Sequence, residues 1–256
     1  MEILDELKKD YVRDLVKAGK RVDDRAFDAF RPITVEKGVL TSTEGSARVK
    51  WGKTQVLAGI KFDVTTPFKD RPDEGVLSTN SELLPLASPT FEPGPPDERS
   101  IELARVVDRG IRSANVIDLK SFYLDEGKVL ALYIDLYVLD HDGNFIDASA
   151  LAAMAALANT KFPKIEGGEI VRGEYSGELK LGNKVVTTTF AKIGNALLLD
   201  PNLDEETAMD GRITIATTEK SVCAIQKGGK GGFTRAELDY LFDLALAKGN
   251  ELRALI

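Results

Sequence analysis

The stretch KVLALYIDLYVLDHDGNFIDASALAAMAALANTKF, residues 128–162, joins the most apolar run of the chain to an alanine-rich segment. Residues 130–140 are typical of a central strand, and HDGN (141–144) is the turn that ends it. A helix is predicted over residues 147–162, where alanine and leucine side chains surround most of the helix. Because small side chains let a helix pack closely on a sheet, we expect this helix to be deeply buried.

Segments with strand periodicity lie on both sides of this stretch. Before it, three runs predict an antiparallel meander with turns at Glu44-Gly45 and Gly52-Lys53. These runs cover residues 33–40, 45–52 and 54–64, and one more strand is expected within 75–91. After it, strands are predicted at residues 184–194, 196–202, 211–220 and 221–229. A final helix follows, with Thr234 as its cap and Glu237 completing a capping box.

Each half of the chain therefore consists of strands followed by a helix. This layout predicts an α+β fold built from a duplicated β-α unit, with mixed and antiparallel sheets and packed helices. We expect one domain over residues 1–256, with a helical extension at 1–20 and halves at about 30–160 and 161–256. The extension is amphipathic over 2–18, a pattern that suits a partner-docking helix and a helix packed on its own domain equally well.

The bulk composition excludes several classes of protein. The 256 residues are 43% hydrophobic and 29% charged, as in ordinary globular proteins, and the net charge is −7. Any contact with nucleic acid must therefore come from a local basic patch. With Cys223 and His141 as the single residues of their kinds, neither a disulfide nor a Cys/His metal cage is possible within the chain. The charged N-terminus and the lack of a bilayer-length apolar run predict a cytoplasmic protein with no membrane contact.

The segment PGPPDERSIELARVVDRGIRSANVID (93–118) contains the candidate patch. A helix is predicted from about Glu98 to Ala114, with Asp97 as its N-cap. Its arginines at positions 105, 109 and 112 fall within about 60° of one another, opposite the apolar face. A row of guanidinium groups suits a phosphate chain. The alternative is a solvated face in which Glu102 pairs with Arg105, and Asp108 with Arg112.

An acidic cluster follows in the second half, within LDPNLDEETAMDG (199–211). Its carboxylates belong to Asp200, Asp204, Glu205, Glu206 and Asp210. Paired carboxylates can hold Mg²⁺ or supply a general acid. The alternative is a solvated acidic loop between two strands. GGKGG (228–232) lacks the spacing of a phosphate-binding loop and favours a flexible turn.

Several segments, in order, resemble the RNase PH family. They are residues 19–60, with their R-x-D-x-R and R-P-I motifs, and residues 98–113, 133–157 and 197–217. The resemblance covers nearly the whole chain. It implies the duplicated β-α fold and assembly into six-domain rings that degrade RNA from its 3′ end with phosphate as the nucleophile.

Two departures from the active members of that family concern chemistry. Active members carry a G-T-R segment whose arginine binds the attacking phosphate, and here the segment is Gly143-Asn144-Phe145. A phenylalanine cannot neutralise a phosphate dianion. An aspartate of the strand after the acidic cluster is replaced by Arg212, which inverts the charge at a proposed metal or acid position. We therefore expect no catalytic residue, metal ligand or cofactor in this chain, with phosphate and any Mg²⁺ bound at a partner's active site.

The chain is thus similar to the non-catalytic RNase PH-like ring subunits of the archaeal exosome. That resemblance implies a hexameric ring in which three such subunits alternate with three catalytic ones, a trimeric RNA-binding cap, and single-stranded RNA as a further partner. It implies that Arg105 and Arg109 contact the RNA backbone, with Arg112 and Arg99 as weaker candidates on the same helix. Two alternatives remain. One is an active phosphate-dependent 3′-5′ exoribonuclease that uses Asp204, Glu206 or Asp210, and the other is a purely structural ring spacer.

Overall fold

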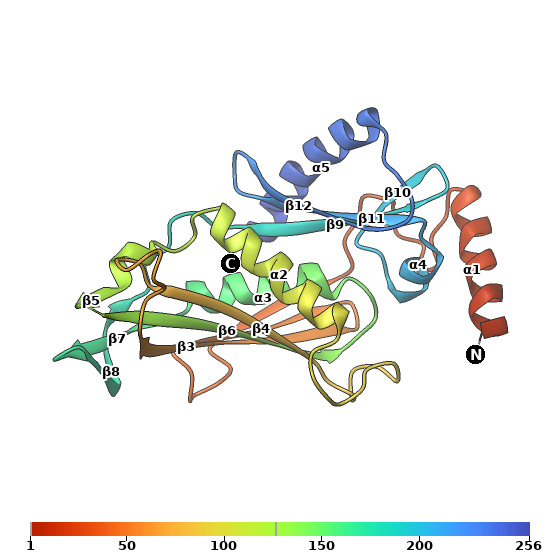
Figure 1. Ribbon diagram of the computed structural model, residues 1–256. Helices are drawn as coiled ribbons and strands as arrows, with labels where there is room; N and C mark the ends of the chain where they lie inside the picture. The colour runs from red at the N-terminus through yellow and green to blue at the C-terminus, as the bar shows by residue number, and fades with distance from the viewer. Residues whose placement is uncertain (1, 126) are drawn as a thin grey trace.

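The computed structural model describes residues 2–125 and 127–256, and its elements stack in four layers (Figure 1). A six-stranded sheet forms one outer layer, and the helices α2 (Glu98–Ser113) and α3 (Phe145–Ala158) lie on it. A four-stranded sheet covers these helices from the other side, and α5 (Arg235–Arg253) packs on that sheet. The predicted α+β architecture of sheets and packed helices is confirmed.

The six-stranded sheet has the order β1-β2-β3-β6-β4, with β5 paired to β6. Its strands are β1 (Ile33–Lys37), β2 (Gly45–Trp51), β3 (Thr54–Thr65), β4 (Val76–Leu83), β5 (Tyr123–Asp125) and β6 (Lys128–Asp140). The meander of β1, β2 and β3 and the central position of β6 agree with the prediction. β4 runs parallel to β6, which makes the sheet mixed. The tight turn predicted at Glu44-Gly45 is wrong, because Gly38 (φ +68°) ends β1 early and residues 38–44 form a longer connection.

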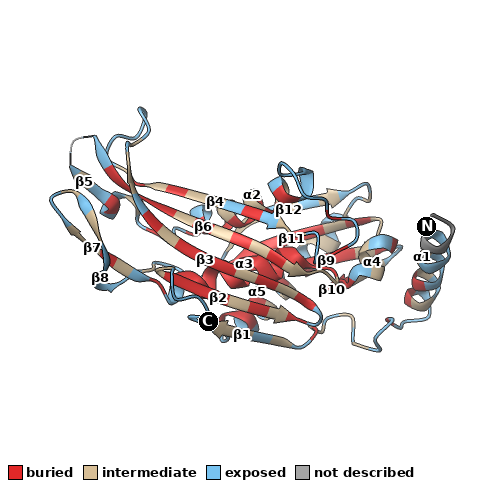
Figure 2. Cartoon of the chain, turned by 90° about the horizontal axis from the view of Figure 1, so that it is seen from below, coloured by how far each residue is buried: buried red, intermediate tan, exposed pale blue. Residues whose placement is uncertain are grey.

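The core is centred on α3, as Figure 2 shows by the buried residues that gather around it. Every residue of α3 from Phe145 to Leu157 is buried. The helix begins at Phe145 and not at Asp147, and the predicted end at residue 162 is wrong. The Thr160 hydroxyl donates to the Ala156 carbonyl at 2.7 Å, and the chain then enters β7. The helix thus ends at Ala158, the last alanine of the run.

The second half contains the four-stranded sheet in the order β10-β9-β11-β12. Its strands are β9 (Val186–Ile193), β10 (Ala196–Leu199), β11 (Gly211–Thr217) and β12 (Val222–Gly229). Thr234 and Glu237 form the predicted capping box of α5. The sequence did not predict the hairpin of β7 (Lys161–Glu166) and β8 (Glu169–Glu178), the one-turn helix η1 (Leu119–Phe122) or the short helix α4 (Leu203–Ala208).

The N-terminal helix α1 (Glu2–Lys17) packs on its own chain, against α4 at one end of the molecule (Figure 1). Val12 and Val16 are buried in a small cluster that includes Leu198. Leu7 and Tyr11 stay about 60% exposed on the same helix. Within the described part of the chain, no helix has the length and apolarity that a membrane crossing requires.

Candidate nucleic-acid interface

Helix α2 is fixed between the two sheets by its cap and its apolar face. The Asp97 carboxylate accepts a hydrogen bond from the Ser100 backbone N–H at 2.9 Å, as predicted for an N-cap. The buried Ser100 side chain donates to the Ser81 carbonyl of β4. Leu103 and Ile111 are among the side chains that α2 buries in the core. The charged face of α2 is therefore held rigidly relative to the second sheet.

Arg105 and Arg109 are exposed and line the same groove. The groove has a volume of about 470 Å³, and its lining includes Glu98, Glu102 and Gln226 of β12. Arg109 donates to the Gln226 side-chain oxygen at 3.1 Å. Among the described residues, no hydrogen bond or ion pair involves the Arg105 guanidinium. The structure thus brings together the two arginines that the resemblance implied as RNA contacts, on a surface open to a ligand.

The ion pair predicted between Glu102 and Arg105 is wrong. Glu102 instead forms a short ion pair with Arg212 of β11. The Gln226 side-chain amide also donates to Glu102, at 3.1 Å. Sequence reasoning missed these partners because residues 102, 212 and 226 come from three separate elements. The only signal was the unusual arginine at position 212.

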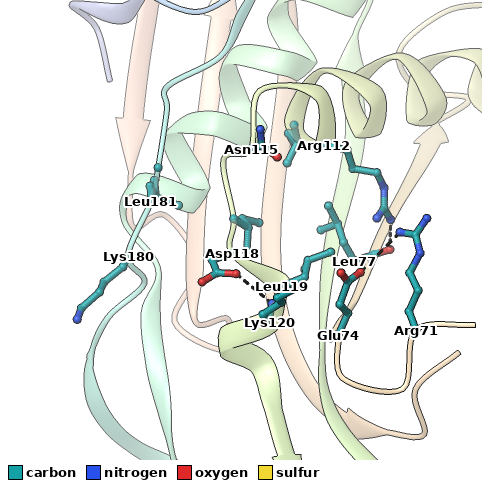
Figure 3. Close-up of a pocket in the computed structure, with 13 residues that line it drawn as sticks. Arg71, Glu74, Leu77, Arg112, Asn115, Asp118, Leu119, Lys120, Lys180 and Leu181 are labelled. Carbon is teal, nitrogen blue, oxygen red and sulfur yellow. Dashed lines mark hydrogen bonds and ion pairs between the residues drawn. The ribbon is translucent and has the colours of Figure 1, made fainter.

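Arg112 and Arg99 lie elsewhere on α2. Arg112 forms the predicted ion pair with Asp108, at 2.7 Å, and donates to the Leu77 carbonyl at 2.6 Å. It lines a separate pocket of about 610 Å³ beside Arg71, in which Lys180 points away from Arg112 (Figure 3). Arg99 pairs with Asp97 at 2.8 Å and lies over the Phe91 ring. Both guanidinium groups have partners within the chain.

The segment Gly143-Asn144-Phe145 forms the start of α3, and an aromatic stack surrounds it. The Phe145 ring meets His141 edge-on with centroids 5.0 Å apart, and His141 stacks on Phe91 at 5.3 Å. Burial, together with the charges of Arg99 and Arg31, lowers the pKa of His141 to about 4. His141 is therefore neutral at pH 7. The rings of the stack carry no charge at pH 7, and the guanidinium that lies over Phe91, that of Arg99, is paired with Asp97.

A carboxylate, and not an anion-binding cation, faces the N-terminus of α3. The Asn144 backbone N–H donates to Glu206 at 2.8 Å, with Asn144 itself at φ +51°. Loss of solvation raises the pKa of Glu206 to about 7. A bound phosphate dianion would meet this carboxylate and the Phe145 ring. The residues present therefore do not fit phosphate.

The acidic cluster is mostly a structural network, so the prediction of a solvated loop is wrong for its buried members. Asp200 is ion-paired with Arg31 at 2.7 Å and with Arg25 at 3.0 Å. Burial raises the pKa of Asp200, but the hydrogen bonds and charge of Arg31 outweigh it and hold that pKa below its usual value. Glu205 forms a fully buried pair with Arg21 at 2.6 Å. Three arginines of the R-x-D-x-R and R-P-I motifs thus hold residues 200–205 in place.

The remaining acids also have partners. Asp210 pairs with Arg13 of α1 at 2.5 Å, and Asp204 lies 3.8 Å from Lys8. No group of three or more His, Cys, Asp or Glu side chains across residues 2–125 and 127–256 is arranged to hold a metal ion. The arrangement can hold the fold together and present arginines. The Arg31 guanidinium at the start of α3 donates to the Gly143 carbonyl and is ion-paired with Asp200.

Comparison with known proteins extends this description. The model of the 3′ exoribonuclease family, domain 1, matches residues 29–163, and that of domain 2 matches residues 183–248. The exosome complex component Rrp42 of Thermococcus gammatolerans is 50% identical over 100% of this chain and 96% of its own length. The Rrp42 component of Methanothermobacter thermautotrophicus is 48% identical over 98% of this chain and 95% of its own.

Solved structures show the same similarity. A chain of the Archaeoglobus fulgidus exosome with RNA bound to the active site superimposes with a TM-score of 0.91 at 43% identity, covering 98% of both chains. A chain of an archaeal exosome core gives a TM-score of 0.88 at 41% identity, over 98% of this chain and 96% of that one. The RNase PH-like fold expected from the sequence is confirmed. The chain belongs to the 3′ exoribonuclease family, the RNase PH family.

Proposed function

We propose that this chain is a non-catalytic subunit of an exosome, a complex that degrades RNA from its 3′ end with phosphate. In this proposal it completes the neighbouring catalytic subunit's active site, and Arg105 and Arg109 hold the RNA backbone there. The observation that carries the proposal is the groove on α2, where two exposed arginines lie together and Arg105 has no partner among the described residues. Phosphate contacts of this kind position a strand without reading its sequence.

The absence of catalysis is proposed from the start of α3. Phe145 stands in an aromatic stack, and Glu206 accepts the Asn144 N–H at the place where an attacking phosphate would need positive charge. An active enzyme built on Asp204, Glu206 or Asp210 is less well supported, because Asp210 is ion-paired with Arg13. Phosphate and any Mg²⁺ would then act at the partner's site.

The assembly is proposed from similarity to exosome components and core structures. Three copies of this chain would alternate with three catalytic RNase PH-like subunits in a hexameric ring. A trimeric cap with RNA-binding domains would occupy one face, and single-stranded RNA would thread the ring. We place the complex in the cytoplasm.

The experiment is charge reversal in the assembled ring, with RNA affinity measured against salt concentration. Arg105→Glu and Arg109→Glu should each weaken binding and make the slope of log K against log salt shallower by about 0.7 for single-stranded RNA. Arg235→Glu is the matched control, because Arg235 is an exposed arginine on α5, outside the groove. Unchanged slopes and turnover in both groove variants would favour a purely structural spacer.

A further inference from the structure

We infer that Arg212 is a positioning residue for RNA: it binds Glu102 and so leaves Arg105 and Arg109 available to RNA phosphates. The inference rests on the proposed function and deepens it. The residue at position 212 is an arginine of β11. The geometry assigns it a task of its own, exerted through Glu102 and not by contact with RNA.

Glu102 is the carboxylate of the groove that is placed to neutralise the charge of Arg105. It lies three residues before Arg105 on α2, which is the spacing at which opposite charges pair on a helix. Such a pair would neutralise the one guanidinium of the groove that has no partner among the described residues. In the structure Glu102 points instead to Arg212, whose side chain is only 14% exposed. The ion pair is thus partly shielded from water, where charge pairing is screened less than at an open surface.

Gln226 links the same carboxylate to the second arginine. Its amide nitrogen donates to Glu102, and its amide oxygen accepts from Arg109, both at 3.1 Å. A chain of contacts therefore runs from Arg212 through Glu102 and Gln226 to Arg109. It joins α2 to β11 and β12, two strands of the four-stranded sheet, so the orientation of the groove depends on that sheet.

The Arg212 side chain occupies space that is free because residue 228 is a glycine. In the β11–β12 register, Gly228 lies opposite Arg212. A Cβ at position 228 would come within 2.7 Å of the Arg212 Nε and 3.4 Å of its Cζ. The backbone there does not have a positive φ, so steric room and not backbone freedom is what glycine provides. This explains one glycine of GGKGG, a motif with no other assigned role.

The charge count shows why the pair matters. The groove lining holds two carboxylates, Glu98 and Glu102, and two arginines, so by itself it is neutral. Arg212 adds one positive charge beside Glu102 and leaves the groove net cationic. At physiological salt, screening acts over about 8 Å, so this local balance decides whether an RNA phosphate is attracted.

The test uses the ring assembled with its catalytic partner and single-stranded RNA. Arg212→Ala should release Glu102 toward Arg105, weaken binding several-fold and make the salt slope shallower by about 0.7. Like Arg212→Ala, the double variant Arg212→Ala/Glu102→Gln has no ion pair at this position. Unlike Arg212→Ala, it has no carboxylate that could pair with Arg105. It should regain the wild-type slope. Gly228→Ala should shift binding in the same direction as Arg212→Ala, because it displaces the Arg212 side chain.

The outcomes separate the possible explanations. A double variant that stays as weak as Arg212→Ala would overturn the inference, since Arg212 would then act by direct contact or by structure alone. Normal RNA binding by Arg212→Ala, with a defect in Arg105→Glu, would overturn the inference and leave the proposed function standing. Normal binding by both variants would count against the proposed function itself. Thermal unfolding of each variant identifies losses that come from misfolding.

Discussion

The side chain at position 145 separates this site from one that binds phosphate. Phe145 is 8% exposed and contacts His141, so the position is part of the core and not an open anion site. The position therefore differs from an anion-binding site by more than one missing charge. The neighbouring His141 ring packs against an aromatic ring at this position. The Glu206 carboxyl group accepts a hydrogen bond from the adjacent Asn144 N–H.

Phe145→Arg should consequently fail to create activity in the isolated chain. The new guanidinium would lose the aromatic contact with His141 and enter a buried position, at a cost of about 2–4 kcal/mol in the free energy of unfolding. Urea unfolding and phosphate-dependent RNA cleavage measure the two effects. Release of nucleoside diphosphates by this variant alone would show that a single arginine suffices.

Glu206 makes a prediction about pH. Loss of solvation raises its pKa to about 7, above its ordinary value of 4.5. The folded chain then keeps a proton that the unfolded chain releases between these values, so the contribution of Glu206 to stability is largest below pH 4.5 and is lost as pH rises toward 7. In Glu206→Gln, the free energy of unfolding should decrease less with rising pH than in the wild type, by at most about 3 kcal/mol. Unfolding free energies measured from pH 5 to pH 8 test it.

The matched control is Asp204→Asn, which removes a carboxylate from the same short helix near the surface. It should leave the decline between pH 5 and pH 8 as it is in the wild type. An identical decline in wild type and Glu206→Gln would mean that Glu206 is ionised throughout this range in the folded chain.

At the scale of elements, the sequence predicts the helices whose first residues follow a recognisable capping residue. α2 and α5 were predicted because Asp97 and Thr234 cap them. The β7–β8 hairpin was missed because most residues of β8 are exposed, so no alternation marks it. α4 was missed because it is a single short helix within an acidic segment. The groove arginines could be named from one helix, whereas the Arg212–Glu102 pair required the tertiary structure.

The buried pair of Arg21 and Glu205 shows how a loop and a short helix are locked together. Two nitrogens of Arg21 bind the Glu205 carboxylate, at 2.8 and 2.6 Å, and both side chains are fully buried. Arg21→Met should lower the free energy of unfolding by about 3–5 kcal/mol, because it leaves a buried carboxylate without its partner. Urea unfolding measures this loss.

Arg235→Met provides the comparison, since its ion pair with Asp239 is exposed and should contribute under about 1 kcal/mol. Adding Glu205→Gln to Arg21→Met should recover part of the loss by removing a buried charge whose remaining cation, Arg25, lies 3.8 Å away. Equal stabilities of Arg21→Met and Arg235→Met would contradict the assignment of Arg21 as a structural anchor.

At the scale of the whole molecule, the four layers fix the position of the arginine groove. α2 lies between the two sheets, so both halves of the chain fix the groove formed by α2 and β12 (Figure 1). The sheets and packed helices of an α+β fold could be predicted from the strand and helix patterns. The side on which the arginines emerge could not, because it depends on packing between residues more than a hundred positions apart.

The most direct test measures nucleoside diphosphates released from 3′-tailed RNA in the presence of phosphate and Mg²⁺. The purified chain is compared with the same chain assembled with its catalytic partner. We predict no phosphate-dependent release by the chain alone and rapid release by the assembled ring, slowed by Arg105→Glu and Arg109→Glu but not by Arg235→Glu. Phosphate-dependent release of nucleoside diphosphates by the chain alone would contradict the account.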